Sequence, residues 1–352
     1  MPKINVMVLQ GGQSSEHDIS LNTARQVTVG LNPEHYNVRS ITITREGKWL
    51  LPHDPVVLSG GASLREKHGK QAIVEVDHGR ALEKAKEEKT DIIFIALHGG
   101  AGEDGRIQAL LELVGLPYTG SGPLASALAM DKVRSADMYR AHGLHVPFSF
   151  HFTKNLWEEQ RALVLEAIER RVLRPWVVKP ADQGSSVGVS IVGASEDLTA
   201  AIEHAAQCTR TIIIQQYING PEATCSIVEK ESGELVALPP TRIMANAGAF
   251  YDYKSKYATG GSTHVCPADF DEPLNKAIQE AAVTAHRALG CSGMSRTDVI
   301  VGDDGVLYVL ETNTIPGMTP TSLLPEAAKA AGIDFSELLD MLIKRGLKQR
   351  HY

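Results

Sequence analysis

The sequence predicts a protein with α/β and α+β regions and more than one domain. Its 352 residues exceed the roughly 100–150 residues of a typical domain, which suggests two or three domains. Residues 4–9 and 91–96 are short apolar runs followed by glycine-rich turns, as expected for buried strands of an open parallel sheet. Residues 295–313 contain two apolar runs around a Gly/Asp turn, which indicates an antiparallel hairpin.

The composition is that of a soluble globular chain and excludes several function classes. Hydrophobic residues make up 43% and charged residues 22%. Lys and Arg number 35 and Asp and Glu 42, so the formal net charge is −7 and nucleic acid is not an expected partner. No apolar run is long enough to span a bilayer and no signal peptide precedes the first strand, so we expect no membrane association and a cytoplasmic location.

The four cysteines are scattered without a Cys-x-x-Cys pair. This argues against a zinc site and against a disulfide framework.

Residues 4–30 read as a strand, a glycine turn and a helix. The three-glycine fingerprint of dinucleotide-binding proteins is absent, which disfavours a dehydrogenase. Glu16 lies near the start of the helical stretch, where it could bind an ammonium group or simply complement the helix dipole. Taken alone, the residue favours the helix-dipole interpretation.

Strands are expected near residues 38–43 and 72–76, a helix at 81–88 and a buried strand at 91–96. The last strand leads into a glycine-rich loop from His98 to Gly105. Ligands of open α/β sheets bind beyond the carboxyl ends of the strands, so this loop and the Glu16 turn could line one crevice. His98 could equally be an ordinary, hydrogen-bonded loop histidine. After a helix at 106–114, the Gly- and Pro-rich residues 115–123 suggest a domain boundary.

The second region begins with Met130–Lys132, which we place inside an amphipathic helix that ends near His142. Residues 176–180 form a strand that contains Lys179, and residues 181–189 form a Gly/Ser loop. Small residues, backbone amides and an adjacent lysine suit a phosphate-binding loop. A hairpin with a solvated loop is the alternative. The Gly-Lys-Ser/Thr pattern of P-loop proteins is missing.

A helix around residues 197–207 precedes an apolar strand at 212–218 that carries Tyr217 near its end, with Glu222 beyond the next turn. The aromatic ring and the carboxylate could hold an adenine and a ribose, although a strand of the sheet core would look similar. Residues 240–266 form a long segment that we predict to be a lid.

The hairpin at 295–313 is the predicted chemical centre. Because strand side chains repeat with period two, Asp298 on one strand can converge with Glu311 and Asn313 on the other. Two carboxylates and an amide oxygen suit Mg²⁺, which takes further ligands from water and phosphates. Arg296 shares a face with Asp298 and would add a cation for a migrating phosphoryl group. The alternative is an acidic hairpin that faces water.

Taken together, these stretches resemble the D-alanine–D-alanine ligases, a family within the ATP-grasp enzymes. The resemblance covers nearly the whole chain, and the order and number of the motifs make it specific. The motifs are Gly11–Glu16, His98–Gly105, Tyr118–Gly122, Met130–Lys132, Lys179–Pro180, Gly184–Gly188, Tyr251–Tyr253, Lys256–Tyr257, Arg296–Asp298 and Glu311–Thr319. In one departure, the strand reads Gln215-Gln216-Tyr217 where the family more often has an acid first.

The resemblance implies an ATP-grasp architecture of three domains: an N-terminal α/β substrate domain at 1–122, a central unit with the phosphate loop at 123–236, and a C-terminal unit with the metal site and lid at 237–352. It also implies the ligands. ATP would be bound by Lys132, Lys179, Gln215, Tyr217, Ile218, Glu222, Phe250 and Lys256, and two Mg²⁺ (with Mn²⁺ as a substitute) by Asp298, Glu311 and Asn313. Substrates would be bound by Glu16, Ile19, His98, Arg296, Gly317, Ser322 and Leu323, with catalytic roles for Glu16, Ser185, Tyr257, Arg296, Gly317 and Ser322.

The implied reaction is ATP-dependent ligation of two D-alanine molecules through a D-alanyl phosphate, as a step of peptidoglycan precursor synthesis. A homodimer is expected from the same resemblance. Two alternatives remain: a ligase that accepts D-lactate or D-serine as second substrate, and a nucleotide-binding module without ligase activity. The second would be expected to lack Asp298, Glu311 or Lys179, which are present.

Overall fold

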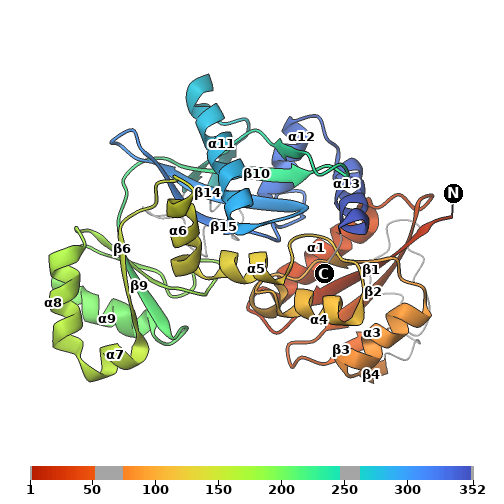
Figure 1. Ribbon diagram of the computed structural model, residues 1–352, viewed down its shortest axis with the longest axis horizontal. Coiled ribbons are helices and arrows are strands. Elements are labelled where there is room, and N and C mark those ends of the chain that lie inside the picture. Colours follow the sequence, from red (N-terminus) through yellow and green to blue (C-terminus); the bar gives the residue numbers. More distant parts are fainter. Residues whose placement is uncertain (1, 52–73, 246–261, 350–352) are drawn as a thin grey trace.

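The computed structural model describes residues 2–51, 74–245 and 262–349. These residues form three β-sheets, and Figure 1 shows them as an N-terminal part in red and orange, a central part in green, and a C-terminal part in blue. The mixed α/β class predicted from the sequence is confirmed. No helix in these ranges has the length and apolar character needed to cross a membrane.

The N-terminal sheet has the strand order β4-β3-β2-β1-β5. Strands β2, β1 and β5 are parallel, and β3 and β4 extend the sheet antiparallel on the other side of β2. The apolar runs of β1 and β5 are buried, as the sequence predicts for parallel strands covered on both faces. The elements are β1 (Ile4–Gly11), α1 (His17–Gly30), β2 (Tyr36–Ile43), β3 (Trp49–Leu51), β4 (Val74–Val76), α3 (His78–Glu87), β5 (Ile92–Ile95), the 3-10 turn η1 (Gly100–Gly102) and α4 (Arg106–Val114).

Two helices lead from this part to the next, and they correct one prediction. Met130 ends the first helix and Lys132 begins the second, so these residues do not lie inside one helix. The cause is Asp131, whose extended backbone breaks the helix while its carboxylate accepts hydrogen bonds from the amides of Val133 and Arg134. The second helix ends at the predicted place, with His142 as its C-cap. The helices are α5 (Pro123–Met130) and α6 (Lys132–Ala141).

The central sheet is antiparallel, with the order β6-β9-β7-β8. It has its own hydrophobic core around Trp157 and Trp176, and Figure 1 shows its helices α7, α8 and α9 gathered at one end of the molecule. Strand β9 ends before Tyr217, which therefore follows the strand. The elements are β6 (Ser149–Thr153), α7 (Lys154–Glu159), α8 (Arg161–Arg171), β7 (Trp176–Pro180), β8 (Ser190–Val192), α9 (Ser195–Ala205) and β9 (Thr211–Gln216).

The third sheet has the order β13-β12-β10-β14-β15, with β11 paired to β10, and α11 packs against it. We expect a domain boundary at 236–237, but β10 and β11 begin before it. Strand β10 pairs with β11 and also with β12 and β14, which follow the expected boundary. The elements are β10 (Glu222–Glu229), β11 (Leu235–Ala237), β12 (Thr241–Ala245), β13 (Ser262–Val265), α11 (Glu272–Leu289), β14 (Met294–Val301), β15 (Leu307–Asn313), α12 (Leu323–Ala330) and α13 (Phe335–Lys348).

The segment at 240–266 differs from the long structureless loop that we predict. Its two ends are strands β12 and β13, which pair antiparallel with each other, while β12 also pairs with β10. The backbone amides and carbonyls at both ends of the segment are thus hydrogen-bonded within a β-sheet. The predicted lid residues Phe250, Lys256 and Tyr257 lie outside the described residues.

Helices α12 and α13 return to the N-terminal sheet and share its core. Leu338, Leu342 and Ile343 of α13 are fully buried in one cluster with residues of β1 and β5. A Cβ on Gly346 would lie 2.7 Å from both the Cδ1 atom of Ile92 and a backbone carbonyl oxygen, so this helix lies in close contact with the sheet. In Figure 1 α13, in dark blue, lies beside α1. The first and last parts of the chain therefore form one packed body.

Candidate active site

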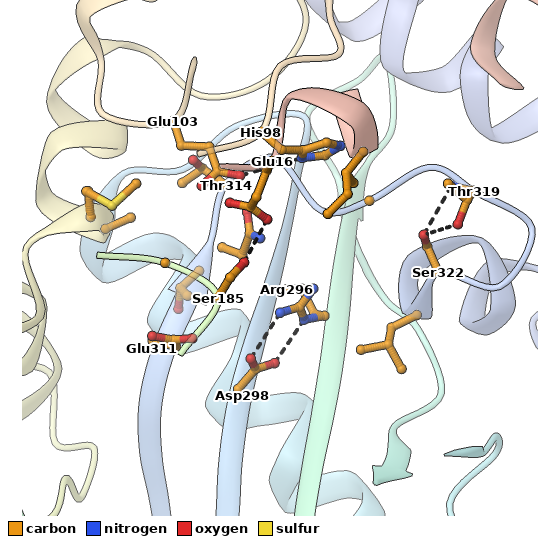
Figure 2. A pocket seen from close by; sticks show the side chains of 18 of the residues that line it. Glu16, His98, Glu103, Ser185, Arg296, Asp298, Glu311, Thr314, Thr319 and Ser322 are labelled. Carbon is orange, nitrogen blue, oxygen red and sulfur yellow. Dashed lines mark hydrogen bonds and ion pairs between the residues drawn. The ribbon is translucent and has the colours of Figure 1, made fainter. Parts of the chain in front are cut away.

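Two adjoining cavities lie where the three sheets meet. The first, of about 460 Å³, is lined by residues from all three parts of the chain, and the second, of about 300 Å³, lies between the central and third sheets. Lys132, Asp298 and Glu311 line both cavities. These three residues therefore stand where the larger cavity meets the smaller one. Figure 2 shows the first cavity with Asp298 and Glu311 in its wall.

Glu16 is joined to the Gly/Ser loop. It is the N-cap residue of α1, yet its side chain makes no capping bond to that helix. Its carboxylate instead accepts a hydrogen bond of 2.7 Å from the Ser185 hydroxyl, and Figure 2 shows this contact at the centre of the first cavity. Glu16 therefore makes a specific contact in the cavity in addition to its place at the helix start. This contact ties the N-terminal sheet to the central part of the chain.

The Gly/Ser loop has the unusual backbone that places Ser185. Ser185 and Ser186 have φ angles of 51° and 57°, in the left-handed region that side chains other than glycine rarely adopt. Such strain is of order 1–3 kcal/mol for each residue and collects at functional sites. Gly188, with φ 72°, is required here, because a Cβ would lie 2.9 Å from the ring of Pro180.

His98 is hydrogen-bonded and also lines the first cavity. Its Nε2 lies 2.8 Å from the Thr23 hydroxyl, and its Nδ1 lies 3.6 Å from a carboxylate oxygen of Glu103. Only 4% of the side-chain surface of His98 is exposed, which matches the conservative interpretation of a satisfied histidine. Its place in the wall of the cavity also matches the interpretation as a ligand residue.

The hairpin of β14 and β15 brings the predicted metal ligands together, as predicted. Asp298 lies directly opposite Glu311, and Arg296 opposite Asn313. Arg296 donates two hydrogen bonds to Asp298, Nε to Oδ1 at 2.9 Å and Nη2 to Oδ2 at 3.0 Å. Thr224 of β10, opposite Asp298 on the other side, donates a third at 2.6 Å. These contacts fix the orientation of the Asp298 carboxylate.

Glu311 is held by Lys132, whose ammonium lies 3.1 Å from Oε2 of the carboxylate. The same ammonium donates a 2.7 Å hydrogen bond to the backbone carbonyl of Gln183 in the Gly/Ser loop. Lys132 therefore links the hairpin to the loop from the central sheet.

The donor set fits Mg²⁺. No cluster of three or more His, Cys, Asp and Glu residues suited to a metal occurs among the described residues. Mg²⁺ needs no such cluster, because one or two carboxylates, water and substrate phosphates suffice. Asp298 accepts three hydrogen bonds and Asn313 Oδ1 accepts one, from the Ile315 amide at 2.8 Å, so each keeps acceptor capacity. Asp298, Glu311 and Asn313 can therefore supply oxygens toward the passage between the cavities.

Lys179 is a buried cation in the second cavity. Within the described part of the chain its ammonium has no hydrogen-bond or ion-pair partner. Burial, and to a smaller extent the neighbouring Lys132, lowers the pKa of Lys179 to about 8, while Glu311 acts in the opposite direction. An anionic ligand in this cavity would supply the missing counter-charge.

The second cavity also collects the residues expected around a nucleoside. Gln215 lies at the end of β9, Tyr217 and Ile218 follow it, and Glu222 begins β10, and all four line the cavity. Gly220 makes the connecting turn: its φ is 146°, and a Cβ there would lie 1.9 Å from the carbonyl oxygen of Val301. The turn brings both the end of β9 and the start of β10 to the wall of the same cavity.

The far wall of the first cavity is the loop that leads into α12. Gly317, Ser322 and Leu323 line it, as does Ile19 of α1. Thr319 in the same loop lies 2.7 Å from the Ser322 hydroxyl, and Figure 2 shows both side chains on this side of the cavity.

All described residues of the predicted site line one or both cavities. The other three, Phe250, Lys256 and Tyr257, lie outside the described residues. Sequence reasoning missed Glu103, Thr224, Thr319 and His264. Glu103 falls within a quoted motif and could have been found there. Thr224 could not, because its contact with Asp298 depends on the pairing of strands far apart in the chain.

Comparisons with known proteins identify the family. A family model described as D-ala D-ala ligase N-terminus matches residues 5–121, and one described as D-ala D-ala ligase C-terminus matches residues 138–344. A D-alanine–D-alanine ligase of Pelotomaculum thermopropionicum is 40% identical over 347 residues, covering 98% of this chain and 97% of the relative. One of Leptospira interrogans is 38% identical, covering 99% of both.

Solved structures agree. The crystal structure of the VanG D-Ala:D-Ser ligase from Enterococcus faecalis has a TM-score of 0.83 at 33% identity, covering 98% of this chain and 100% of that one. The structure of the D-alanine–D-alanine ligase from Bacillus anthracis complexed with ATP has a TM-score of 0.74 at 32% identity, covering 98% of both chains. With both family models matched, relatives aligned along the full length and two joined cavities at the junction of the sheets, the chain belongs to the D-alanine–D-alanine ligase family.

Proposed function

We propose that this protein joins two D-alanine molecules into D-alanyl-D-alanine at the expense of ATP, in the synthesis of peptidoglycan precursors. The observation that carries the proposal is the passage between the cavities. Lys132, Asp298 and Glu311 line both spaces, so the terminal phosphate of a nucleotide in one cavity can meet the carboxylate of an amino acid in the other.

The chemistry explains why such a meeting place is needed. A carboxylate is a poor acyl donor, because it is anionic and would have to expel oxide. A carboxylate oxygen of the first D-alanine attacks the γ-phosphorus, the bond to the bridging oxygen breaks, and ADP leaves. The amine of the second D-alanine, having lost a proton, then attacks the acyl carbon and phosphate leaves. Positioning and charge neutralisation dominate phosphoryl transfer of this kind.

In the first cavity, Glu16 receives the ammonium of the first D-alanine, and its bond to Ser185 at 2.7 Å orients the carboxylate. Arg296, with the backbone amide of Gly317 and the hydroxyl of Ser322, binds the carboxylate of the second D-alanine and the developing oxyanion. The remaining substrate contacts are assigned to Ile19, His98 and Leu323, which line the same cavity.

In the second cavity, Lys132 and Lys179 contact phosphates of ATP, and Gln215, Tyr217, Ile218 and Glu222 surround the nucleoside. Phe250 and Lys256 are assigned to ATP, and Tyr257 to the hydrogen-bonded group of Glu16 and Ser185, from the sequence resemblance alone. Asp298, Glu311 and Asn313 would hold two Mg²⁺, for which Mn²⁺ could substitute. When bound, the metal neutralises charge on the β- and γ-phosphates.

The same proposal includes the setting of the enzyme. We assign residues 1–122, 123–236 and 237–352 to an N-terminal, a central and a C-terminal unit, with the substrates held between them. A homodimer and a cytoplasmic location, where ATP is available, complete the assignment.

The second substrate is the least constrained part, because a structural relative with a TM-score of 0.83 is a D-Ala:D-Ser ligase. The test is phosphate release and product analysis with ATP, Mg²⁺ and D-alanine alone, then with D-serine or D-lactate in competition. We expect D-alanyl-D-alanine as the main product near neutral pH. A main product that contains D-serine or D-lactate would show that this compound, rather than D-alanine, is the second substrate. Phosphate release that no amino acid stimulates would refute ligase activity.

A further inference from the structure

The hydroxyl of Ser322 is held by its neighbour Thr319. The Ser322 Oγ accepts a hydrogen bond from the Thr319 backbone amide at 3.1 Å and lies 2.7 Å from the Thr319 hydroxyl. Both side chains line the first cavity, where Figure 2 shows the two contacts as dashed lines. Two contacts from one residue therefore converge on a single oxygen.

This arrangement is unusual for a serine at this place. Ser322 is the N-cap residue of α12, and such a serine usually accepts a hydrogen bond from the amide of the second or third helical residue. Here it makes no side-chain capping bond. The third helical residue is Pro325, which has no N–H to offer. The Ser322 hydroxyl is thus withdrawn from the helix and turned to the loop.

We propose that Thr319 is a positioning residue for the second D-alanine: it donates from both its amide and its hydroxyl to Ser322 Oγ. An oxygen that accepts two hydrogen bonds keeps its own proton free. The Ser322 O–H is then left to donate to an anionic group in the cavity, as the acceptor carboxylate requires. This inference rests on the proposed function and adds to it the residue that sets the orientation of Ser322.

Gly317 supports the same arrangement. A Cβ at this position would lie 2.8 Å from Ser322 Oγ and 3.4 Å from Ser322 Cβ. An alanine would therefore meet the end of a side chain rather than backbone, and the hydroxyl would have to leave the position in which Thr319 holds it. Gly317 thus leaves the space that the Thr319–Ser322 contact needs.

The test measures phosphate release over a wide range of D-alanine concentration, which yields separate Michaelis constants for the first and second D-alanine, together with that for ATP and the melting temperature. Thr319→Val removes the hydroxyl at nearly equal volume, and Thr319→Ser restores it. We expect Thr319→Val to raise the constant for the second D-alanine about tenfold, as for one lost hydrogen bond to a charged ligand. The other two constants should change less than about twofold, and Thr319→Ser should recover most of the loss.

A double variant shows whether Thr319 acts through Ser322. The double variant Thr319→Val/Ser322→Ala should have the same Michaelis constant for the second D-alanine as Ser322→Ala alone. The effects of two substitutions do not add when one residue acts through the other. The matched control is Thr284→Val on α11. Among the described residues, the Thr284 hydroxyl donates to the Glu280 carbonyl of its own helix and to no other group.

Three results would overturn the inference: an unchanged second constant, additive effects in the double variant, or a parallel rise of all three constants with a lowered melting temperature. A parent protein that forms no D-alanyl-D-alanine would instead refute the proposed function.

Discussion

The proposed contact of the buried Lys179 with nucleotide phosphates predicts that the affinity for nucleotide depends on pH. With its pKa lowered to about 8 by burial, the ammonium is mostly charged near pH 7 and mostly neutral above pH 9 in the free protein. Phosphates placed beside it favour the charged form and return its pKa toward the ordinary value of about 10.4. Binding then takes up a proton, so affinity falls as pH rises.

The size of the effect follows from the two pKa values. Between pH 8 and the higher pKa of the bound state, the dissociation constant increases because a growing fraction of Lys179 is neutral in the free protein. It is proportional to 1 + 10^(pH − 8), so it should rise about eightfold from pH 7.5 to pH 9. The assay is calorimetric titration with ADP in the presence of a chelator, which removes metal from the comparison. ADP has completed its own phosphate ionisation near the start of this range.

Two variants make the result decisive. Lys179→Met should bind ADP more weakly at pH 7.5 and show a much flatter pH dependence, whereas Lys179→Arg stays charged throughout and should also be flat. A parent protein with constant affinity over this range, or a Met variant with the parent slope, would refute the role of the buried ammonium.

The same shift predicts the sign of a stability change. The folded-state pKa lies below the unfolded value, so between about pH 8 and 10 the unfolded chain binds more protons at this group. The contribution of Lys179 to the free energy of unfolding of the ligand-free protein therefore increases with pH in that window, and Lys179→Met should lack it in denaturant titrations.

Three further predictions concern the metal site and the acceptor. Glu311→Gln should abolish Mg²⁺-dependent turnover with little loss of melting temperature, because the partly exposed carboxylate contacts the Lys132 ammonium rather than a hydrophobic core; near-normal turnover would show that Glu311 is not a metal ligand. Thr224→Val should raise the Mg²⁺ concentration for half-maximal rate severalfold by freeing Asp298. Thr224→Ser should restore it, and a serine variant as weak as valine would point to packing instead. Tyr257→Phe, argued from the resemblance alone, should shift products toward D-alanyl-D-lactate, most visibly at lower pH; an unchanged product ratio in competition would dismiss the role of that hydroxyl.

The sequence predicts best those parts whose causes are local. The hairpin at 295–313 was predicted with its facing side chains, because period-two alternation and a Gly/Asp turn fix which residues share a face. The register confirms it, with Asp298 opposite Glu311. The buried strands of the N-terminal sheet were likewise predicted from apolar runs alone.

The features that the sequence did not predict depend on contacts or backbone conformations that a short stretch of sequence does not reveal. Asp131 fits an amphipathic helix by pattern, yet its extended backbone ends the previous helix and its carboxylate caps the following one. Strand β12 was missed because it is stabilised by pairing with β10 and β13 rather than by its own pattern. The left-handed backbone of Ser185 has no sequence signal, since nothing but glycine announces that conformation.

The last helix of the chain bears on how the protein is made. Because α13 packs on β5 beside α1 and completes the hydrophobic core of the N-terminal sheet, that core lacks part of its cover until nearly all 352 residues have been translated. During synthesis the exposed strands are open to chaperones and to contact with other nascent chains. A chain that ends prematurely before Phe335 would lack this cover, so quality control can recognise an incomplete product by its first domain.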